Sequence, residues 1–291
     1  MTLEEHRRFY AEEIAAVAGL KSAALADAFA SVPRERFFPP GPWRIARADM
    51  LTATSSYRTS EDADPRRLYH NILISIDAER NLNNGHPSTL ATWIDAVEIA
   101  EGDRVFHLGC GTGYYTAIMA ELAGSRGHVE AAEVDENLAA RARDNLAPWN
   151  NVEVFAGDGG AFDPGPVDVA FINAGVTHPS ALWFDRLADG GRLLFPLTFT
   201  TGDGAGKGFM ILVRRTGANF TASFVGYVMI YSCTSLRDPE LNAKILKQIS
   251  TGKPPALKSL RRDTHEPGDT CWLHGADFCL SSREASESAS A

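Results

Sequence analysis

Three glycines at alternate positions, Gly109, Gly111 and Gly113, directly follow an apolar run in the stretch HLGCGTGYY. Each glycine costs backbone entropy on folding, so this density indicates that something must come close to the backbone. Where a strand turns into a helix, such a turn gives a ligand access to the free N–H groups and positive dipole end of the helix. The turn, including Cys110, therefore predicts a nucleotide-like cofactor.

Two acidic residues follow the turn at positions that suit a nucleoside. Glu133 ends the next predicted strand, about 20 residues on, where a carboxylate can accept hydrogen bonds from both ribose hydroxyls. Asp158 follows the strand after that, and its carboxylate can accept a hydrogen bond from an adenine amino group while Gly159 leaves room for the ring. Either acid alone fits an ordinary exposed residue equally well; together with the turn they predict a nucleoside site.

The glycine spacing distinguishes between nucleoside cofactors. A dinucleotide-binding turn has the pattern G-x-G-x-x-G, whereas this chain has G-x-G-x-G. The segment FINAGVTHP is superficially like the Asn-Ala-Gly of short-chain dehydrogenases, but their Tyr-x-x-x-Lys pair does not follow at a suitable distance. S-adenosylmethionine carries no pyrophosphate, so the turn would need to hold only an amino-acid moiety and a sulfonium. The pattern favours this cofactor.

From residue 87 onward, apolar runs alternate with helical spacings, and this pattern predicts the elements that position these residues. It predicts helices over 88–97, 114–122, 136–146 and 179–187, and strands over 104–108, 128–134, 152–155, 167–172 and 192–196. Such alternation is typical of a parallel sheet covered by helices on both faces. Two β-rich runs, 209–214 and 220–231, have a short connection that predicts an antiparallel hairpin at the sheet edge. We expect an α/β fold with a doubly wound, mostly parallel, seven-stranded Rossmann-like sheet.

The remaining segments are arranged around this sheet. Thr2 and Glu5 form the capping-box pattern of a helix start, and a second helix is expected over 22–32. The predicted organisation is N-terminal helices and substrate-side loops over 1–86, a cofactor-binding domain over 87–235, an extension over 236–281 and a disordered tail over 282–291. The extension is expected to hold a helix, a proline-rich linker and one further strand, without an assigned role.

Composition and charge argue against several classes of partner. The 291 residues are 44% hydrophobic and 22% charged, as in ordinary globular proteins. A net charge of −9 argues against nucleic-acid binding, which needs clustered Lys and Arg. No apolar run approaches the length of a membrane span, and the N-terminus is a charged helix start. The four cysteines form no C-x-x-C pair. We expect no nucleic-acid partner, no membrane association, no metal and a reducing, cytoplasmic location.

The chain resembles the protein-L-isoaspartate O-methyltransferase family within the class I methyltransferases. The matching segments are VPRERFFP at 32–39, Pro87, LGCGTGY at 108–114, Glu133, GDG at 157–159 and LADGGRLLFP at 187–196. The resemblance implies an S-adenosylmethionine-dependent O-methyltransferase that methylates a carboxylate of a protein or peptide, as in protein repair. A carboxyl group is almost fully ionised at neutral pH, so no general base is needed. Catalysis would depend on alignment of the reactants and exclusion of water.

Hydrogen-bond donors around that carboxylate are therefore the expected catalytic residues. The family has a donor serine in a Thr-Ile-Ser-x-Pro stretch, and alignment on its proline puts Gly85 at the serine position. Four neighbours are candidates to replace it: Asn83, Asn84, His86 and Ser88, of which we predict the last three as catalytic. The alternative is that Asn83 to Gly85 form only a turn and Ser88 caps a helix. Two other functions stay open: a specialised O-methyltransferase of a biosynthetic peptide or small acid, and a cofactor-binding module without catalysis.

Overall fold

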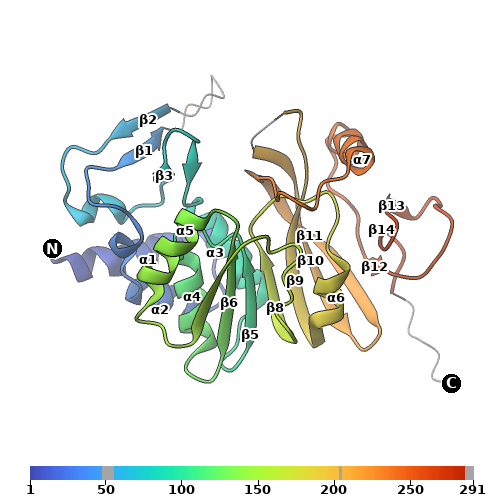
Figure 1. Ribbon diagram of the computed structural model, residues 1–291, viewed down its shortest axis with the longest axis horizontal. Helices are drawn as coiled ribbons and strands as arrows, with labels where there is room; N and C mark the ends of the chain where they lie inside the picture. Colours follow the sequence, from blue (N-terminus) through green and yellow to red (C-terminus); the bar gives the residue numbers. More distant parts are fainter. Residues whose placement is uncertain (48–55, 203–204, 286–291) are drawn as a thin grey trace. The chain divides into compact units, whose positions relative to one another are not determined.

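The computed structural model describes residues 1–47, 56–202 and 205–285 (Figure 1). The chain forms two compact units, each assembled from three segments. The first unit comprises 1–102, 110–128 and 135–154, and the second comprises 103–109, 129–134 and 155–291. The tail predicted as disordered over 282–291 lies outside the described residues from 286 onward.

The first unit begins with the two predicted helices. Helix α1 (Leu3–Ala18) starts with a complete capping box, in which the backbone N–H of Glu5 donates to the Thr2 hydroxyl and the backbone N–H of Thr2 donates to the Glu5 carboxylate. Helix α2 (Ala23–Ser31) is capped by Ser22. Both predictions are confirmed, since the side-chain caps satisfy N–H groups that a helix start leaves without intrahelical partners.

Short elements then occupy the predicted loop-rich stretch. They are η1 (Arg34–Phe37), β1 (Arg44–Arg47), β2 (Ser56–Thr59), η2 (Pro65–Leu68), β3 (Ser75–Asp77) and β4 (Leu82–Asn83). Strands β1 and β2 pair antiparallel, as do β3 and β4. Three longer helices complete the unit: α3 (Pro87–Val97), α4 (Tyr114–Ala123) and α5 (Glu136–Leu146). Eight of the ten residues of α4 are buried, which is why its sequence is apolar on all sides rather than amphipathic.

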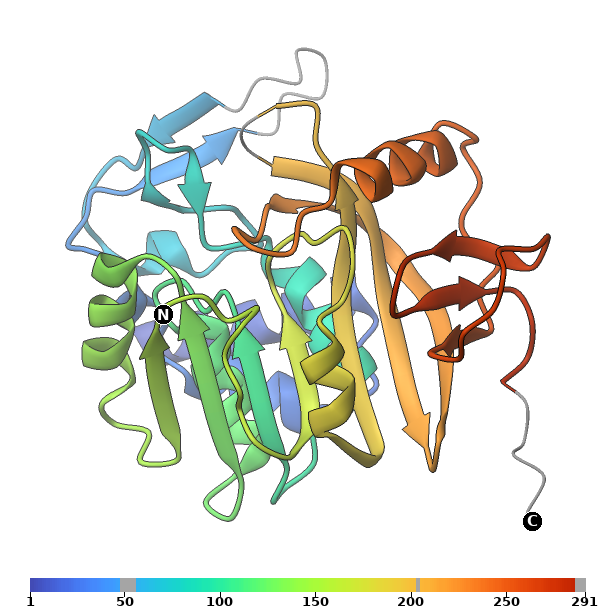
Figure 2. The same ribbon diagram turned by 45° about the vertical axis from the view of Figure 1, so that its right-hand side comes forward.

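A ten-stranded sheet dominates the second unit (Figure 2). Its order is β7 (Val152–Ala156), β6 (His128–Glu133), β5 (Arg104–Leu108), β8 (Val167–Ile172), β9 (Leu187–Phe199), β10 (Ala205–Thr216), β11 (Asn219–Tyr231), β12 (Ser259–Arg261), β14 (Cys279–Ser281) and β13 (Cys271–His274). Strand β8 pairs parallel with β5 and β9, whereas β9, β10 and β11 pair antiparallel. The expected α/β fold and the antiparallel hairpin are confirmed.

The sequence prediction is wrong about the edge of this sheet. The seven expected strands are present, but the β10–β11 hairpin is not the edge, because β12, β14 and β13 continue the sheet beyond it. The extension thus holds three short strands after helix α7 (Pro239–Ile249), where one was expected. Strands of three or four residues are too short to show a period-of-two pattern. They give the exposed backbone of β11 a partner, which protects an otherwise open edge.

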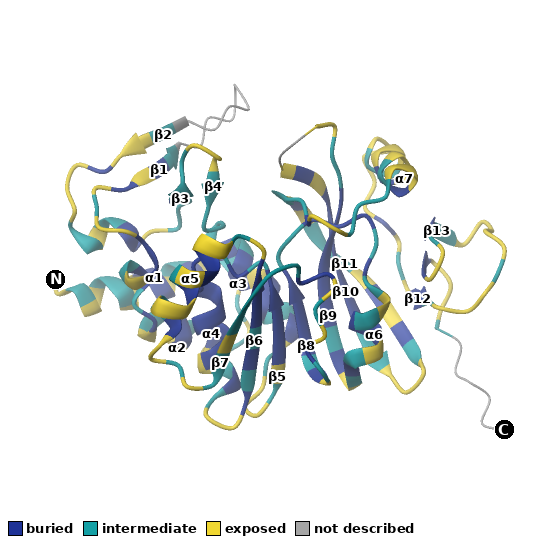
Figure 3. Ribbon diagram, in the orientation of Figure 1, coloured by how far each residue is buried: buried dark blue, intermediate teal, exposed yellow. Residues whose placement is uncertain are grey.

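The middle of the sheet is its most deeply buried part (Figure 3). Phe106, Val169 and Phe171 have no more than 1% of their surface exposed, as expected of strands covered on both faces. His107 lies among them, edge-on to Phe171, and is a core residue. Strand β9 extends well beyond the predicted 192–196, and helix α6 (Ala181–Arg186) precedes it. Among the described residues, no helix combines the length and apolar character needed to span a bilayer.

Candidate functional site

The glycine turn lies where the sequence predicts it, between the end of β5 and the start of α4. Gly109, Gly111 and Gly113 have φ angles of +81°, +57° and +96°. These angles lie in the left-handed region, which residues with a Cβ rarely adopt. The backbone path alone therefore requires glycine at these positions, independently of any ligand.

Packing gives two of the three glycines a second reason. A Cβ on Gly109 would lie 2.9 Å from the carbonyl oxygen of Asn173, and one on Gly113 would lie 2.8 Å from Leu146 Cδ1. Both distances are shorter than real Cβ contacts allow. At these two positions the missing side chain makes room for the protein itself.

Gly111 is different, because a Cβ there would clash with nothing. Apart from its neighbours in the chain, the only described residue within 4 Å of a Cβ built there is Ile76, whose Cδ1 lies at an ordinary contact distance of 3.7 Å. Next to it, Cys110 is buried, and Gly113 caps α4 without a side-chain hydrogen bond. The turn thus has one glycine with room above its backbone, followed by a helix start that has no side-chain cap. This combination suits the close approach of a ligand.

Two backbone hydrogen bonds join the C-terminal ends of the neighbouring strands β5, β6 and β7. The N–H of Gly109 donates to the carbonyl of Ala132 at 2.8 Å, and the N–H of Gly157 donates to the carbonyl of Glu133 at 2.8 Å. Glu133 itself is buried, with 8% of its surface exposed. A carboxylate at the end of the second strand of such a unit lies where nucleoside-binding folds place the acid that contacts the ribose.

Asp158 is held in a defined orientation at the same strand ends. Its Oδ1 accepts hydrogen bonds from the N–H of Gly160 at 2.9 Å and from Ser235 Oγ at 3.0 Å. Among the described residues, Oδ2 has no hydrogen-bond partner. The sequence analysis missed Ser235, because no local pattern links residues so far apart in the chain. Gly159 is required by packing, since a Cβ there would lie 2.7 Å from Leu108 Cγ.

The first unit contains the loop of candidate donors over 83–88, called the donor loop below. Gly85 has a φ of +80°, and a Cβ there would lie 2.8 Å from Leu90 Cδ2. Its N–H donates to Asn83 Oδ1 at 3.0 Å, and its carbonyl accepts from the Tyr115 hydroxyl at 3.2 Å. Gly85 therefore could not be serine without strain, and Asn83 serves the turn. This bond agrees with a turn role for Asn83, which stays a prediction.

Asn84 has one end of its amide fixed and the other available. Its Oδ1 accepts from the backbone N–H of Ile74 at 3.0 Å, and its own backbone N–H donates to the carbonyl of Ile74 at 3.0 Å. Its Nδ2 is buried and has no hydrogen-bond partner among the described residues. A buried donor without a partner costs roughly 1–3 kcal/mol, which makes Asn84 Nδ2 a candidate to contact a ligand.

Ser88 and His86 belong to a small hydrogen-bond network with Asn71. Asn71 Oδ1 accepts from the Ser88 backbone N–H, and Asn71 Nδ2 donates to Ser88 Oγ, both at 3.0 Å. Ser88 Oγ also lies 3.2 Å from His86 Nδ1. Burial, and then the nearby charge of Arg34, lower the pKa of His86, which keeps its imidazole neutral at pH 7. The N-cap of α3 is His86, so the expectation that Ser88 caps this helix is wrong.

The buried side chain of Arg34 holds the backbone on both sides of Asn71. Its guanidinium donates to the carbonyls of Leu68, His70 and Ile72, the last two at 2.8 and 3.0 Å. It also lies over the ring of Tyr10, 5.3 Å from the centroid. Arg34 comes from the VPRERFFP segment, which the sequence analysis used only as a mark of resemblance. Its structural role is to hold the backbone over 68–72, which includes Asn71, the hydrogen-bond partner of Ser88.

Comparisons with known proteins agree with these features. The family model for protein-L-isoaspartate(D-aspartate) O-methyltransferase matches residues 11–205. The protein-L-isoaspartate O-methyltransferase of Ignicoccus hospitalis is 30% identical over 199 residues, which cover 67% of this chain and 83% of that protein. Protein-L-isoaspartate O-methyltransferase 1 of Archaeoglobus fulgidus is 29% identical over 206 residues, covering 69% and 83%.

Solved structures show the same fold. A protein-L-isoaspartate O-methyltransferase structure superposes with a TM-score of 0.60 at 22% identity, covering 82% of this chain and 69% of the other. A Plasmodium falciparum protein, described as a candidate enzyme of the same name and solved with S-adenosyl-L-homocysteine, gives 0.58 at 14% identity, covering 78% and 98%. At these identities the likeness establishes the class I methyltransferase fold.

Proposed function

Since the chain belongs to the protein-L-isoaspartate O-methyltransferase family, we propose that this S-adenosylmethionine-dependent enzyme methylates the carboxylate of an isoaspartyl residue in a protein or peptide. The observation that carries the proposal is the family match over 195 residues that include the glycine turn, Glu133 and Asp158. The buried Nδ2 donor of Asn84, which has no partner among the described residues, supports a carboxylate as the methyl acceptor.

The residues of the chain fit the cofactor. At Gly111 the position of the missing Cβ is free of clashes, so a ligand can come close to the backbone, and the buried carboxylate of Glu133 suits the ribose hydroxyls. Asp158 Oδ2 is oriented by the bonds that Ser235 and Gly160 make to Oδ1, and we assign it to the adenine amino group. When bound, S-adenosylmethionine supplies a methyl group activated by a positively charged sulfur.

The contribution of the protein to methyl transfer is positioning. The substrate carboxylate is already ionised at neutral pH, so the side chains need to hold it rather than deprotonate it. We assign Asn84 Nδ2 as a donor to one carboxylate oxygen and the Ser88–His86 pair as the neighbouring polar group. Fixing two reactants in line can lower the barrier by roughly 7–11 kcal/mol.

Incubation with radiolabelled S-adenosylmethionine tests the proposal directly. We expect base-labile label on an isoaspartyl peptide and none on the same peptide with normal aspartate. The glycine at position 85, where the family has serine, favours a second candidate: a relative specialised for a biosynthetic peptide or small acid. Label on another carboxylate, but on neither of the two peptides, would support this candidate. Cofactor binding without turnover on any carboxylate would identify a non-catalytic module.

A further inference from the structure

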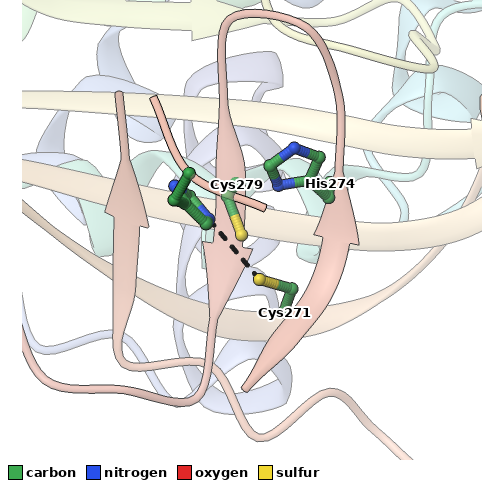
Figure 4. Close-up of side chains that lie close together, drawn as sticks. Cys271, His274 and Cys279 are labelled. Carbon is green, nitrogen blue, oxygen red and sulfur yellow. Dashed lines mark hydrogen bonds between the residues drawn. The ribbon is translucent and has the colours of Figure 1, made fainter. Parts of the chain in front are cut away.

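The C-terminal extension brings two histidines and two cysteines together. His265, Cys271, His274 and Cys279 form the pattern H-x5-C-x2-H-x4-C, and one side-chain N or S atom from each lies within 4.8 Å of those of the other three. Cys271 and His274 are at the two ends of β13, and Cys279 begins the neighbouring strand β14. Figure 4 shows these three side chains turned toward one another. The cluster lies beyond residue 205, where the family match ends.

Distances within the cluster suit a shared metal ion. Cys271 Sγ lies 3.5 Å from His265 Nε2, the contact dashed in Figure 4. With zinc–sulfur and zinc–nitrogen bonds of about 2.3 and 2.05 Å, tetrahedral geometry places two such ligand atoms about 3.6 Å apart. The rings of His265 and His274 are also close, with centroids 4.8 Å apart. All four cysteines of the chain, including Cys271 and Cys279, are free thiols.

The surroundings leave the ligand atoms available and orient them. His265 Nδ1 lies 2.9 Å from the carbonyl oxygen of Asp263, so this nitrogen donates there and Nε2 keeps its lone pair. Metal-binding histidines are held in this way by a carbonyl or carboxylate on the other ring nitrogen. The N–H of Gly268 donates to Cys271 Sγ at 3.4 Å, a bond that favours a thiolate. His274 Nδ1 is buried and has no hydrogen-bond partner among the described residues.

From these contacts we propose that His265, Cys271, His274 and Cys279 bind one Zn²⁺ ion in a structural site. Two sulfur and two nitrogen ligands in a tetrahedral arrangement are characteristic of zinc, and four protein ligands leave no open position for catalysis. On binding, each of the two thiols releases one proton, and the two thiolates neutralise the ion. The partly buried site therefore carries no net charge, which lowers the cost of its burial.

The site gives the extension a function that its sequence does not suggest. The loop over 262–270 is exposed except at His265, so it has little apolar surface to hold it against the strands. A metal ion joins this loop to β13 and β14, at the end of the ten-stranded sheet. The cluster contains no C-x-x-C pair, because a histidine precedes each of its cysteines in the pattern H-x5-C-x2-H-x4-C. The absence of C-x-x-C pairs therefore did not reveal it.

Metal analysis of the full-length chain tests this proposal without relying on methyl transfer. The protein is expressed without a histidine tag in zinc-supplemented medium and purified with reductant. We expect about one zinc per chain by inductively coupled plasma mass spectrometry. Cys271→Ser, Cys279→Ser and His265→Ala should each retain less than about a fifth of it, whereas Cys233→Ser and His6→Ala, which alter residues outside the cluster, should retain it all.

Two further measurements separate loss of metal from loss of folding. Cobalt added to metal-free wild-type protein should give the visible absorption of tetrahedral thiolate-bound Co²⁺, and a chelator should lower the melting temperature of the wild type but not of His265→Ala. The proposal is overturned if the wild type contains no zinc and gives no cobalt spectrum. It is equally overturned if the cluster variants keep their zinc.

Discussion

The guanidinium of Arg34 donates a hydrogen bond of 2.8 Å to the carbonyl of His70, the residue directly before Asn71. A second bond from Arg34 to Ile72, at 3.0 Å, fixes the other side of Asn71. Since Asn71 in turn holds Ser88 by two hydrogen bonds, the fully buried side chain of Arg34 helps to fix the end of the donor loop. This chain of contacts links a segment near the N-terminus to the proposed site.

Replacing Arg34 should therefore reduce both stability and activity. Arg34→Lys keeps the charge but cannot reach several carbonyls at once, and we expect the free energy of unfolding to fall by about 2–4 kcal/mol. Urea denaturation measures this loss. Arg36→Lys is the matched control, since Arg36 is an exposed arginine of the same segment, and it should cost less than about 1 kcal/mol. Equal losses in the two variants would contradict the role of Arg34.

Glu133 should contribute to cofactor affinity. In Glu133→Ala the proposed hydrogen bonds to the ribose are lost, and we expect binding of S-adenosylhomocysteine to weaken by about 1–3 kcal/mol. Isothermal titration calorimetry provides the measurement. Glu136→Ala removes an exposed acid three residues away and should bind as the wild type does. Unchanged affinity in Glu133→Ala would refute the assignment.

Asn84 should act through its Nδ2 donor. Asn84→Asp keeps the oxygen that accepts from Ile74 but replaces the donor with a negative oxygen that repels a substrate carboxylate. We expect kcat/KM for the methyl acceptor to fall about 10- to 100-fold, with cofactor affinity unchanged. Asn81→Asp adds the same charge at an exposed position of the same hairpin and should have little effect. A wild-type kcat/KM in Asn84→Asp would remove Asn84 from the site.

Restoring the family serine should be harmful. Gly85→Ser introduces a Cβ at a φ of +80° and 2.8 Å from Leu90, so we expect a loss of about 1–3 kcal/mol in unfolding free energy. Adding Gly85→Ser to a Leu90→Ala background separates the two causes, because the loss relative to Leu90→Ala alone contains the backbone strain but not the contact with the buried Leu90 side chain. Thermal and urea denaturation give both values. A Gly85→Ser variant as stable as the wild type would mean that the loop tolerates a side chain.

His107 should make the core sensitive to acid. Burial lowers its pKa to about 3, so the folded protein keeps this ring neutral while the unfolded chain binds a proton below about pH 6.5. Stability is therefore complete above about pH 6.5 and is lost as the pH falls toward 3, by up to about 1.4 kcal/mol per pH unit. In His107→Leu this contribution disappears. Denaturation between pH 7 and 4.5 should show a shallower slope in the variant; identical slopes would contradict the prediction.

Local patterns in the sequence determined the order of the elements and the identity of the family. The capping box at Thr2, the alternation after residue 87 and the glycine turn each involve residues close together in the chain, where spacing reports directly on helix, strand or turn. The same local signals placed Glu133 and Asp158 at strand ends.

Contacts between distant residues were decided only by the tertiary structure. The bond from Ser235 to Asp158, the network of Asn71 with Ser88, and the bonds of Arg34 to the backbone around Asn71 join side chains with no sequence spacing in common. The same holds for the cluster around Cys271 and for the three strands that continue the sheet, because each of those strands is too short to have a pattern of its own. Packing of the whole chain brings such groups together, so their contacts can be identified only from the folded structure.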